Sequence, residues 1–269
     1  ATRVNSQGLI EDMQILSGDL ISNGDFSQEG SQLVTNGDFA TDSNWTKQAS
    51  WSISGGAANY DFLSDAKYIR QTLLSGGFVA GKSYKINFEI TSGTAYMYVS
   101  SNAAGLISLN TYSVGSYSIY VTASASGSDL LIYGRNTSGT AFSIDNVSVK
   151  EVGQDWTLGT GWSIGEDIAN CSGGAAQVLY QANLIPIGTQ YKLTFTVSNF
   201  SQGYLSAYGG DWDAQGVIEA NGTFTIYTEK LATSNTGFVG NGFVGSITNI
   251  SLIEITDDTN LPRIDYSPY

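Results

Sequence analysis

The chain contains no histidine, and this absence removes most of the side-chain chemistry that enzymes use near neutral pH. Without imidazole there is no Ser–His–Asp or Cys–His arrangement and no His-based metal site. Two carboxylates could still cleave a glycosidic bond. Glu89, however, matches Thr196 in a related part of the chain, and Asp61 and Asp65 have no acidic counterparts there. We therefore predict that the protein is not an enzyme, with a glycan-cleaving enzyme as the least favoured alternative.

The charges restrict the partners. The formal net charge is −13, from 11 Lys and Arg against 24 Asp and Glu, and the few basic residues are widely spread. No basic stripe is present to neutralise phosphates, so we expect neither nucleic acid nor an anionic membrane as a partner. No apolar stretch reaches the length of a membrane helix. Cys171 is the single cysteine, which excludes an intramolecular disulfide and suggests a small buried thiol.

Four sequence patterns occur twice in the same order, with small drifts in spacing. This indicates two copies of one domain that differ in loop length, since the period is too long for a solenoid repeat. The matched pairs are Gly81–Ile90 with Gly188–Val197, Gly115–Tyr120 with Gly222–Tyr227, Trp45 and Trp51 with Trp156 and Trp162, and Ile144–Val149 with Ile247–Leu252.

The repeated segments alternate apolar and polar residues with period two. Tyr84, Ile86, Phe88 and Ile90 alternate with polar residues, which is typical of half-buried antiparallel strands. The stretch 64–74 fits a short helix or a strand. A copy of about 110 residues suits a jelly roll. We predict an all-β fold of two tandem jelly-roll, galactose-binding-like β-sandwiches at 33–152 and 153–256, with an arm or leader strand at 1–32 and an extended arm at 257–269.

The paired aromatic residues predict the core. Both copies keep Trp45 and Trp156, Trp51 and Trp162, Tyr84 and Tyr191, and Phe88 and Phe195. A shared fold requires such matches, whereas a shared ligand does not, so we expect all of them to be buried.

The ends of the first copy resemble a known family. Leu33–Phe39, then Trp45 and Trp51, and finally Ile144–Val149 are similar to the opening and closing strands of carbohydrate-binding modules of families four and nine. Those are galactose-binding-like jelly rolls found beside glycosidases and in bacteriophage structural proteins. The segments 1–11 and 260–266 are similar to flanking segments of large phage virion proteins. The resemblance therefore implies a virion protein of the fibre, tail or capsid-decoration type.

The opening strand is itself duplicated. Leu20–Phe26 repeats the pattern of Leu33–Phe39 and precedes it by 13 residues. Because Trp45 follows Phe39 at the family's spacing, we assign Leu33–Phe39 to the first jelly roll. The earlier copy is then a leader that pairs with another chain or a neighbouring domain, or else a flexible linker.

In the resembling family, a structural Ca²⁺ sits where the first and last strands meet. Asp38 and Asp145 could supply carboxylates there and Asn36 a carbonyl oxygen, as a hard cation requires. The second copy has Thr248 in place of Asp145, so we expect any such ion in the first domain alone. The alternative is that both acids cap turns.

Sugar recognition needs aromatic faces with amide or carboxylate groups nearby. In the second copy Trp212 is the leading candidate, because a Trp between two acids in a Gly-rich loop seldom buries fully; its alternative is a contact with a neighbouring subunit. For Tyr96 and Tyr98 the alternative is core packing. The glycan-binding candidates are Tyr96, Tyr98, Tyr112, Tyr133 and Arg135 in the first copy, and Tyr204, Tyr208, Asp211, Trp212 and Asp213 in the second.

The combined prediction is a non-enzymatic phage virion structural protein whose jelly rolls decorate the particle and adhere to host surface glycans. A secreted bacterial tandem carbohydrate-binding module is the alternative. Residues 1–22 and 257–269 are expected to contact other virion proteins. By analogy with fibres we expect a homo-oligomer, with a trimer as the working guess. The expected location is the virion surface, or the extracellular medium for a secreted module.

Overall fold

The computed structural model describes residues 2–4, 10–12, 15–101, 109–182, 184–208, 217–230 and 235–255. Strands dominate this part of the chain, and its single helical segment is a 3-10 turn at Leu74–Gly76. The all-β prediction is confirmed. The stretch 64–74 contributes a strand that is followed by this short turn. Among the described residues, no helix is long and apolar enough to cross a membrane.

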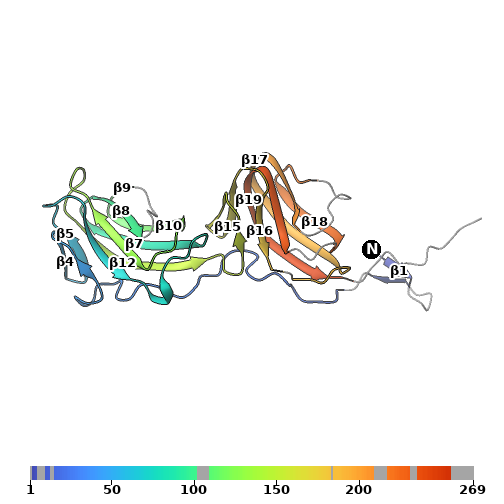
Figure 1. Ribbon diagram of the computed structural model, residues 1–269, viewed down its shortest axis with the longest axis horizontal. Coiled ribbons are helices and arrows are strands. Elements are labelled where there is room, and N and C mark those ends of the chain that lie inside the picture. Colours follow the sequence, from blue (N-terminus) through green and yellow to red (C-terminus); the bar gives the residue numbers. More distant parts are fainter. Residues whose placement is uncertain are drawn as a thin grey trace, which may run out of the picture. The chain divides into compact units, whose positions relative to one another are not determined.

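The chain divides into two compact units (Figure 1). We call residues 26–154 with 163–168 the first unit, and residues 1–25, 155–162 and 169–269 the second unit. The second unit is therefore discontinuous, since the chain leaves it after Asp25 and returns at Asp155. A short hairpin of β1 (Thr2–Val4) and β2 (Ile10–Asp12) precedes the leader.

Two antiparallel five-stranded sheets build the first unit. The aliphatic and aromatic side chains of alternate positions point between the sheets and form one core. One sheet has the order β10 (Gly115–Thr122), β7 (Ser83–Ser92), β12 (Phe142–Val152), β5 (Ala57–Tyr60) and β4 (Trp51–Ser54). The other has the order β3 (Thr46–Lys47), β6 (Lys67–Thr72), β11 (Asp129–Gly134), β8 (Ala95–Ser101) and β9 (Asn110–Tyr112).

Two very long strands replace four shorter ones in the second unit. β17 (Gln190–Tyr208) covers the positions of β7 and β8, and β19 (Thr236–Glu254) covers those of β11 and β12. They pair with each other along most of their length, with register shifts between Ser198 and Gln202 and at Tyr204. The sheet has the order β13 (Thr157–Leu158), β16 (Gln177–Gln181), β19, β15 (Ile168–Ser172) and β14 (Trp162–Gly165), and β17 also pairs with β18 (Gly222–Glu229). Residues 163–168, which include most of β14 and the first residue of β15, are counted with the first unit.

The matched aromatic residues are buried in both units, as predicted. Trp45, Trp51, Trp156 and Trp162 are each at most 7% exposed. Tyr84, Tyr191, Phe88 and Phe195 are buried as well. Cys171 is a buried thiol, and burial raises its pKa.

The predicted separate arm at 1–32 differs from the structure, because residues up to Asp25 belong to the second unit and residues from Phe26 belong to the first unit. Leu16 and Leu20 donate their N–H groups to the carbonyl oxygens of Glu254 and Leu252 in β19, and Gly24 accepts from Ile250. In Figure 1 the blue chain that follows the N-terminal hairpin runs alongside the second unit before the first unit begins. Of the roles left open for this strand, which were pairing with another chain, pairing with a neighbouring domain and a flexible linker, the structure shows pairing with β19 of the second unit.

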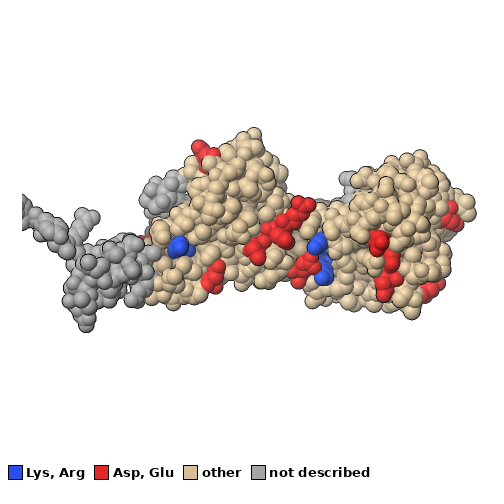
Figure 2. Space-filling view, turned by 180° about the vertical axis from the view of Figure 1, so that it is seen from behind, with Lys and Arg blue, Asp and Glu red and all other residues tan. Residues whose placement is uncertain are grey.

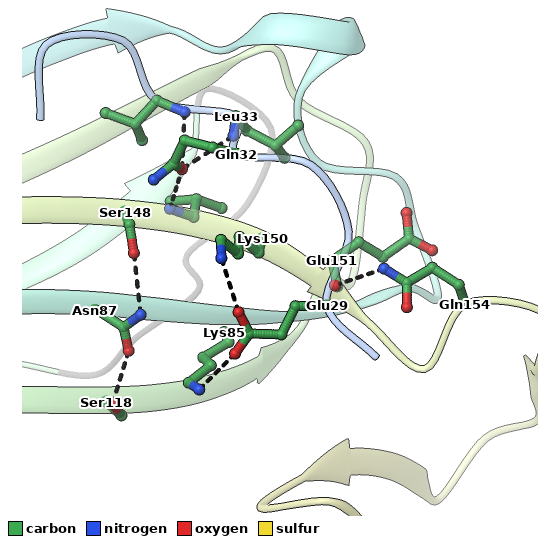
Figure 3. A network of polar contacts seen from close by, with 12 residues as sticks. Glu29, Gln32, Leu33, Lys85, Asn87, Ser118, Ser148, Lys150, Glu151 and Gln154 are labelled. Atoms are coloured by element: carbon green, nitrogen blue, oxygen red, sulfur yellow. Dashed lines mark hydrogen bonds and ion pairs between the residues drawn. The ribbon is translucent and has the colours of Figure 1, made fainter. Parts of the chain in front are cut away.

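Leu33–Phe39 pairs with β12 of the first unit, the position expected for an opening strand. The residues just before it are fixed to the same unit (Figure 3). Glu29 accepts hydrogen bonds from Lys85 at 2.6 Å and Lys150 at 2.9 Å, and these bonds hold the pKa of its carboxyl below its ordinary value. The side-chain oxygen of Gln32 accepts the N–H groups of Leu33, Val34 and Val149.

Charged side chains on the face drawn in Figure 2 form small separate groups, and Lys and Arg do not gather into a continuous patch there. The sequence has few bases to form such a patch, since it contains 11 Lys and Arg against 24 Asp and Glu.

Candidate functional site

Three tyrosines form a straight row across the outer face of one sheet in the first unit. Tyr68 of β6, Tyr133 of β11 and Tyr98 of β8 are direct cross-strand partners. Alternation along each strand turns them away from the core, because their neighbours Ile69, Ile132 and Val99 are buried. We call Tyr68, Tyr133 and Tyr98 the tyrosine row.

The rings of the tyrosine row pack against one another. Tyr98 and Tyr133 stack with ring centroids 4.5 Å apart and an angle of 6° between the planes. Tyr68 meets Tyr133 edge-on at 5.3 Å. All three are half-buried, and burial is the main reason that the pKa of Tyr98 is raised. The phenol rings thus form an ordered aromatic strip rather than separate mobile side chains.

An ion pair borders the row on one side. Arg135 lies two residues after Tyr133, just past the end of β11, and its Nε lies 2.8 Å from Oδ1 of Asp65. The same oxygen accepts the N–H of Asn136 at 3.0 Å. The hydrogen bond from Arg135 is the main reason that the pKa of the Asp65 carboxyl is lowered. This contact fixes the position of the guanidinium group and is the main reason that the pKa of Arg135 is raised.

A second pair of charges borders the row on the other side. Arg70 lies two residues after Tyr68 on β6, and its guanidinium is 3.5 Å from the carboxylate of Asp129. Asp129 is nearly buried and also accepts a 2.8 Å hydrogen bond from the hydroxyl of Thr72. The aromatic strip therefore lies between two arginines, each fixed by a carboxylate.

This arrangement suits a flat, hydroxyl-rich ligand. Aromatic side chains pack against the C–H faces of a sugar ring, and tyrosine hydroxyls and guanidinium groups bond its hydroxyls. It does not suit acid–base hydrolysis, since the carboxylates of Asp65 and Asp129 each bond an arginine.

Four of the residues predicted for the first copy come together here: Tyr96, Tyr98, Tyr133 and Arg135. The main chain joins two of them, because the Arg135 N–H donates to the Tyr96 carbonyl oxygen at 2.9 Å. Tyr112 is buried against Phe88 and Tyr117 and belongs to the core. Sequence reasoning missed Tyr68, because the stretch 64–74 fits either a short helix or a strand and has no clear period.

Different residues occupy the equivalent positions on the outer face of the second unit. Val178, Val239 and Ser206 occupy the row that the three tyrosines fill in the first unit. Of the predicted residues, Tyr208 contacts Tyr180 with centroids 5.3 Å apart, one row further along. Tyr204 lies at the register shift of β17 and joins no such row. Asp211, Trp212 and Asp213 lie outside the described residues.

The residues proposed for calcium make local turn contacts. The side-chain oxygen of Asn36 accepts the N–H of Thr41 at 3.3 Å. Asp38 accepts the N–H of Ala40, and Asp145 that of Asn146. Burial and the charges of Glu89 and Asp38 raise the pKa of Asp145. Within the described ranges no cluster of three His, Cys, Asp or Glu side chains could hold a metal ion. The predicted calcium set has two acids and one carbonyl oxygen, and it stays a prediction.

A pocket of about 310 Å³ lies on the other sheet of the first unit, over β4, β5 and β12. Ser92 donates to Ser143 at 2.9 Å, and Ser143 donates to Asn59 at 2.6 Å. The second unit repeats the link, because Ser246 donates to Asn170 at 2.7 Å. A contact kept by both units is best explained as support for the sheet.

Comparison with known proteins gives structural likeness only. No protein-family model matches the chain, and no curated protein sequence matches it significantly. Among solved structures it is similar to the CBM22-1–CBM22-2 tandem domain of Xyn10C from Paenibacillus barcinonensis, at 10% identity and a TM-score of 0.37, covering 85% of this chain and 99% of that one.

Two further structures are similar at lower scores. Allantoicase from Saccharomyces cerevisiae has 9% identity and a TM-score of 0.26, with 90% of this chain and 100% of that chain covered. A Paenibacillus xanthan lyase has 14% identity and a TM-score of 0.22, with 79% and 24% covered. Likenesses at this level carry no argument about what the chain binds.

Proposed function

We propose that the protein is a non-enzymatic glycan-binding protein, and that its first unit binds the glycan on the tyrosine row. The observation that carries the proposal is the row itself: three tyrosines in cross-strand register, bordered by Arg135–Asp65 and Arg70–Asp129. A surface strip of three ordered aromatic rings between fixed charges has the chemistry that sugar recognition requires.

The internal duplication supports the proposal. Both units keep the buried tryptophans that the fold needs, whereas the tyrosine row occurs in the first unit and is replaced by Val178, Val239 and Ser206 in the second. Because the second unit has the same fold without these tyrosines, the fold does not require them, and ligand binding can explain their presence in the first unit.

A glycan array on the full chain, followed by calorimetric titration of the best ligand, tests the proposal. Tyr133→Ala should weaken binding roughly thirtyfold, because a central aromatic anchor contributes about 2 kcal/mol. Val239→Ala at the equivalent position of the second unit is the matched control and should leave the affinity unchanged. Equal effects of the two substitutions, or no glycan ligand at all, would count against the proposal.

The finer part of the proposal is that the protein is a phage virion structural protein that adheres to host glycans, at the virion surface and as a homo-oligomer, with a trimer as the guess. It is supported by the resemblance of Leu33–Phe39 and Ile144–Val149 to modules found in such proteins. A secreted tandem module with the same glycan face is the alternative. The proposed assembly segment 257–269 lies outside the described residues.

Deletion of 257–269 separates these two roles. Loss of incorporation into particles with unchanged glycan affinity would support the virion role, and normal incorporation would contradict the assembly role of this segment. Deleting residues 1–22 would be a poor test, because Leu16–Ser22 pairs with β19 and its loss would damage the second unit. Mass photometry of the purified chain measures the oligomeric state.

A further inference from the structure

The same set of contacts holds an opening strand in each unit. In the first unit, Gln71 forms a pair of hydrogen bonds with the main chain of Thr35: its Oε1 accepts the N–H at 2.7 Å, and its Nε2 donates to the carbonyl oxygen at 2.6 Å. Nε1 of Trp45 donates to the carbonyl oxygen of Asn36 at 3.0 Å. Val147 of β12 donates its N–H to the oxygen of Gly37 at 2.8 Å.

The second unit repeats these contacts on the leader. Gln181 accepts the N–H of Ser22 at 3.2 Å and donates to its oxygen at 2.6 Å. Trp156 donates to the oxygen of Asn23 at 3.0 Å. Ile250 of β19 donates to the oxygen of Gly24 at 2.9 Å. Like Gln71, Gln181 is almost fully buried, so its amide is a built recognition element rather than a surface contact.

The close approach of the strand makes the glycine a specificity determinant. A Cβ added to Gly24 would lie 1.9 Å from the carbonyl oxygen of Ile250, and one added to Gly37 would lie 2.0 Å from that of Val147. Backbone atoms of a paired strand cannot move aside easily, so any larger residue is excluded at this position. The glycine is the position at which these contacts select a residue type, whereas the two residues before it are held through their main-chain atoms.

The strand bound in the second unit is remote from its groove along the chain. Asn23 and Trp156 are separated by 133 positions, Ser22 and Gln181 by 159, and Asp19 and Leu252 by 233. No short loop links the leader to the groove it fills. Its contacts are hydrogen bonds and packing, which do not depend on where the strand's chain continues.

We propose that the groove formed by Gln181, Trp156 and β19 is an acceptor site for an extended peptide of the leader's sequence, and that a second copy of this chain supplies that peptide when the groove's own leader is displaced. The occupant follows from the contacts, since both grooves of the chain hold this one motif. When two copies exchange their leaders, each leader makes the same contacts in the other copy's groove. Only the course of the chain after Asp25 changes, and swapping of an identical element between protomers has a low cost under this condition.

Cutting the folded chain tests the acceptor site. A protease site inserted between Ser27 and Gln28 is cleaved after folding, and excess labelled peptide of residues 15–27 is added. Native mass spectrometry should show one labelled peptide per chain. The peptide with Gly24→Ala should bind about tenfold more weakly or worse. Equal incorporation of both peptides, or no exchange under any condition that leaves both units folded, would overturn the proposal.

Two further measurements address the groove and the source of the strand. Gln181→Ala in the cut chain should speed release of the leader, whereas Gln71→Ala, in the other unit, should not; equal release rates would contradict the assignment. Uncut chain refolded at high concentration should form dimers that excess peptide converts to monomers. Monomers at every concentration would overturn the role of the second copy.

Discussion

The two units fill the same core position in different ways. In the first unit Trp51, Tyr60 and Phe142 form an aromatic cluster with centroids 5.3 to 5.6 Å apart. In the second unit the positions of Tyr60 and Phe142 hold Cys171 and Gly245, which are partners across β15 and β19.

The lost volume in the second unit is filled from elsewhere. The ring of Phe243 stacks on Trp162 at 6.2 Å, and a Cβ on Gly245 would lie 2.7 Å from that ring. A core can thus keep its tryptophan and change its other residues if the total volume is conserved. The outer faces have no such constraint, and there the tyrosine row has no counterpart.

The largest expected difference between the units comes from a pair of equivalent glycines. A Cβ on Gly134 would lie 2.7 Å from the buried ring of Tyr60, whereas one on Gly240 would meet Phe243 at 3.2 Å and the Cys171 sulfur at 3.4 Å. Gly134→Ala should lower the free energy of unfolding of the first unit by about 3 kcal/mol, and Gly240→Ala that of the second by about 1 kcal/mol or less. Hydrogen exchange resolved by unit measures both; equal losses would show that the cores do not differ as described.

The glutamines that clamp the opening strands should show the opposite behaviour, with equal effects in the two units. Gln181→Ala removes the bonds to two main-chain groups and Gln71→Ala those to the same two and, more weakly, to the Asn44 oxygen at 3.3 Å, so each should cost about 2 kcal/mol in its own unit. Gln177→Ala, which removes an amide bonded to nearby Ala175, is the control. A loss confined to one unit would break the equivalence of the two grooves.

Transfer of the tyrosine row tests whether the outer face alone separates the units. Val178→Tyr, Ser206→Tyr and Val239→Tyr together rebuild the row in the second unit. If the proposed glycan site is correct, calorimetry should then show a second, weaker site, because the bordering ion pairs are not transferred. An unchanged stoichiometry would mean that the rings alone do not make a site.

The smallest expected effect is the pH dependence of the Asp65–Arg135 pair. The pKa of Asp65 is lowered from its ordinary value of about 3.8, so its contribution is fully present above that value and is lost as the pH falls through the lowered pKa. Glycan affinity should be constant from neutral pH down to about 5 and decline only in stronger acid. Asp65→Asn should have a small effect at pH 7, because the pair is exposed to solvent. A midpoint near neutrality would exclude Asp65 as its origin.

The sequence predicted the strands and the buried tryptophans because alternation and duplication both report directly on burial. It could not assign the leader, since Leu20–Phe26 and Leu33–Phe39 carry the same motif and spacing favours the nearer one. A usable signal was present: the second copy lacks this motif before Trp156, while a spare copy stands at the start of the chain.

The candidate site was only partly visible in the sequence. Tyr96, Tyr98, Tyr133 and Arg135 follow from alternation on two strands, but Tyr68 comes from a stretch without a clear period. Which strands are neighbours decides the row, and adjacency between β6, β11 and β8 is a property of the sheet order that no local pattern contains.

The discontinuous second unit has a consequence for biosynthesis. Its opening strand is translated before the whole first unit and β19 after it, so the opening strand waits while the residues between Asp25 and Thr236 are translated, which takes about ten seconds or more. The whole first unit is translated before β19 is available to pair with the opening strand of the second unit. Nascent chains are thus expected to mature from the inside outward, with the oldest residues joining last.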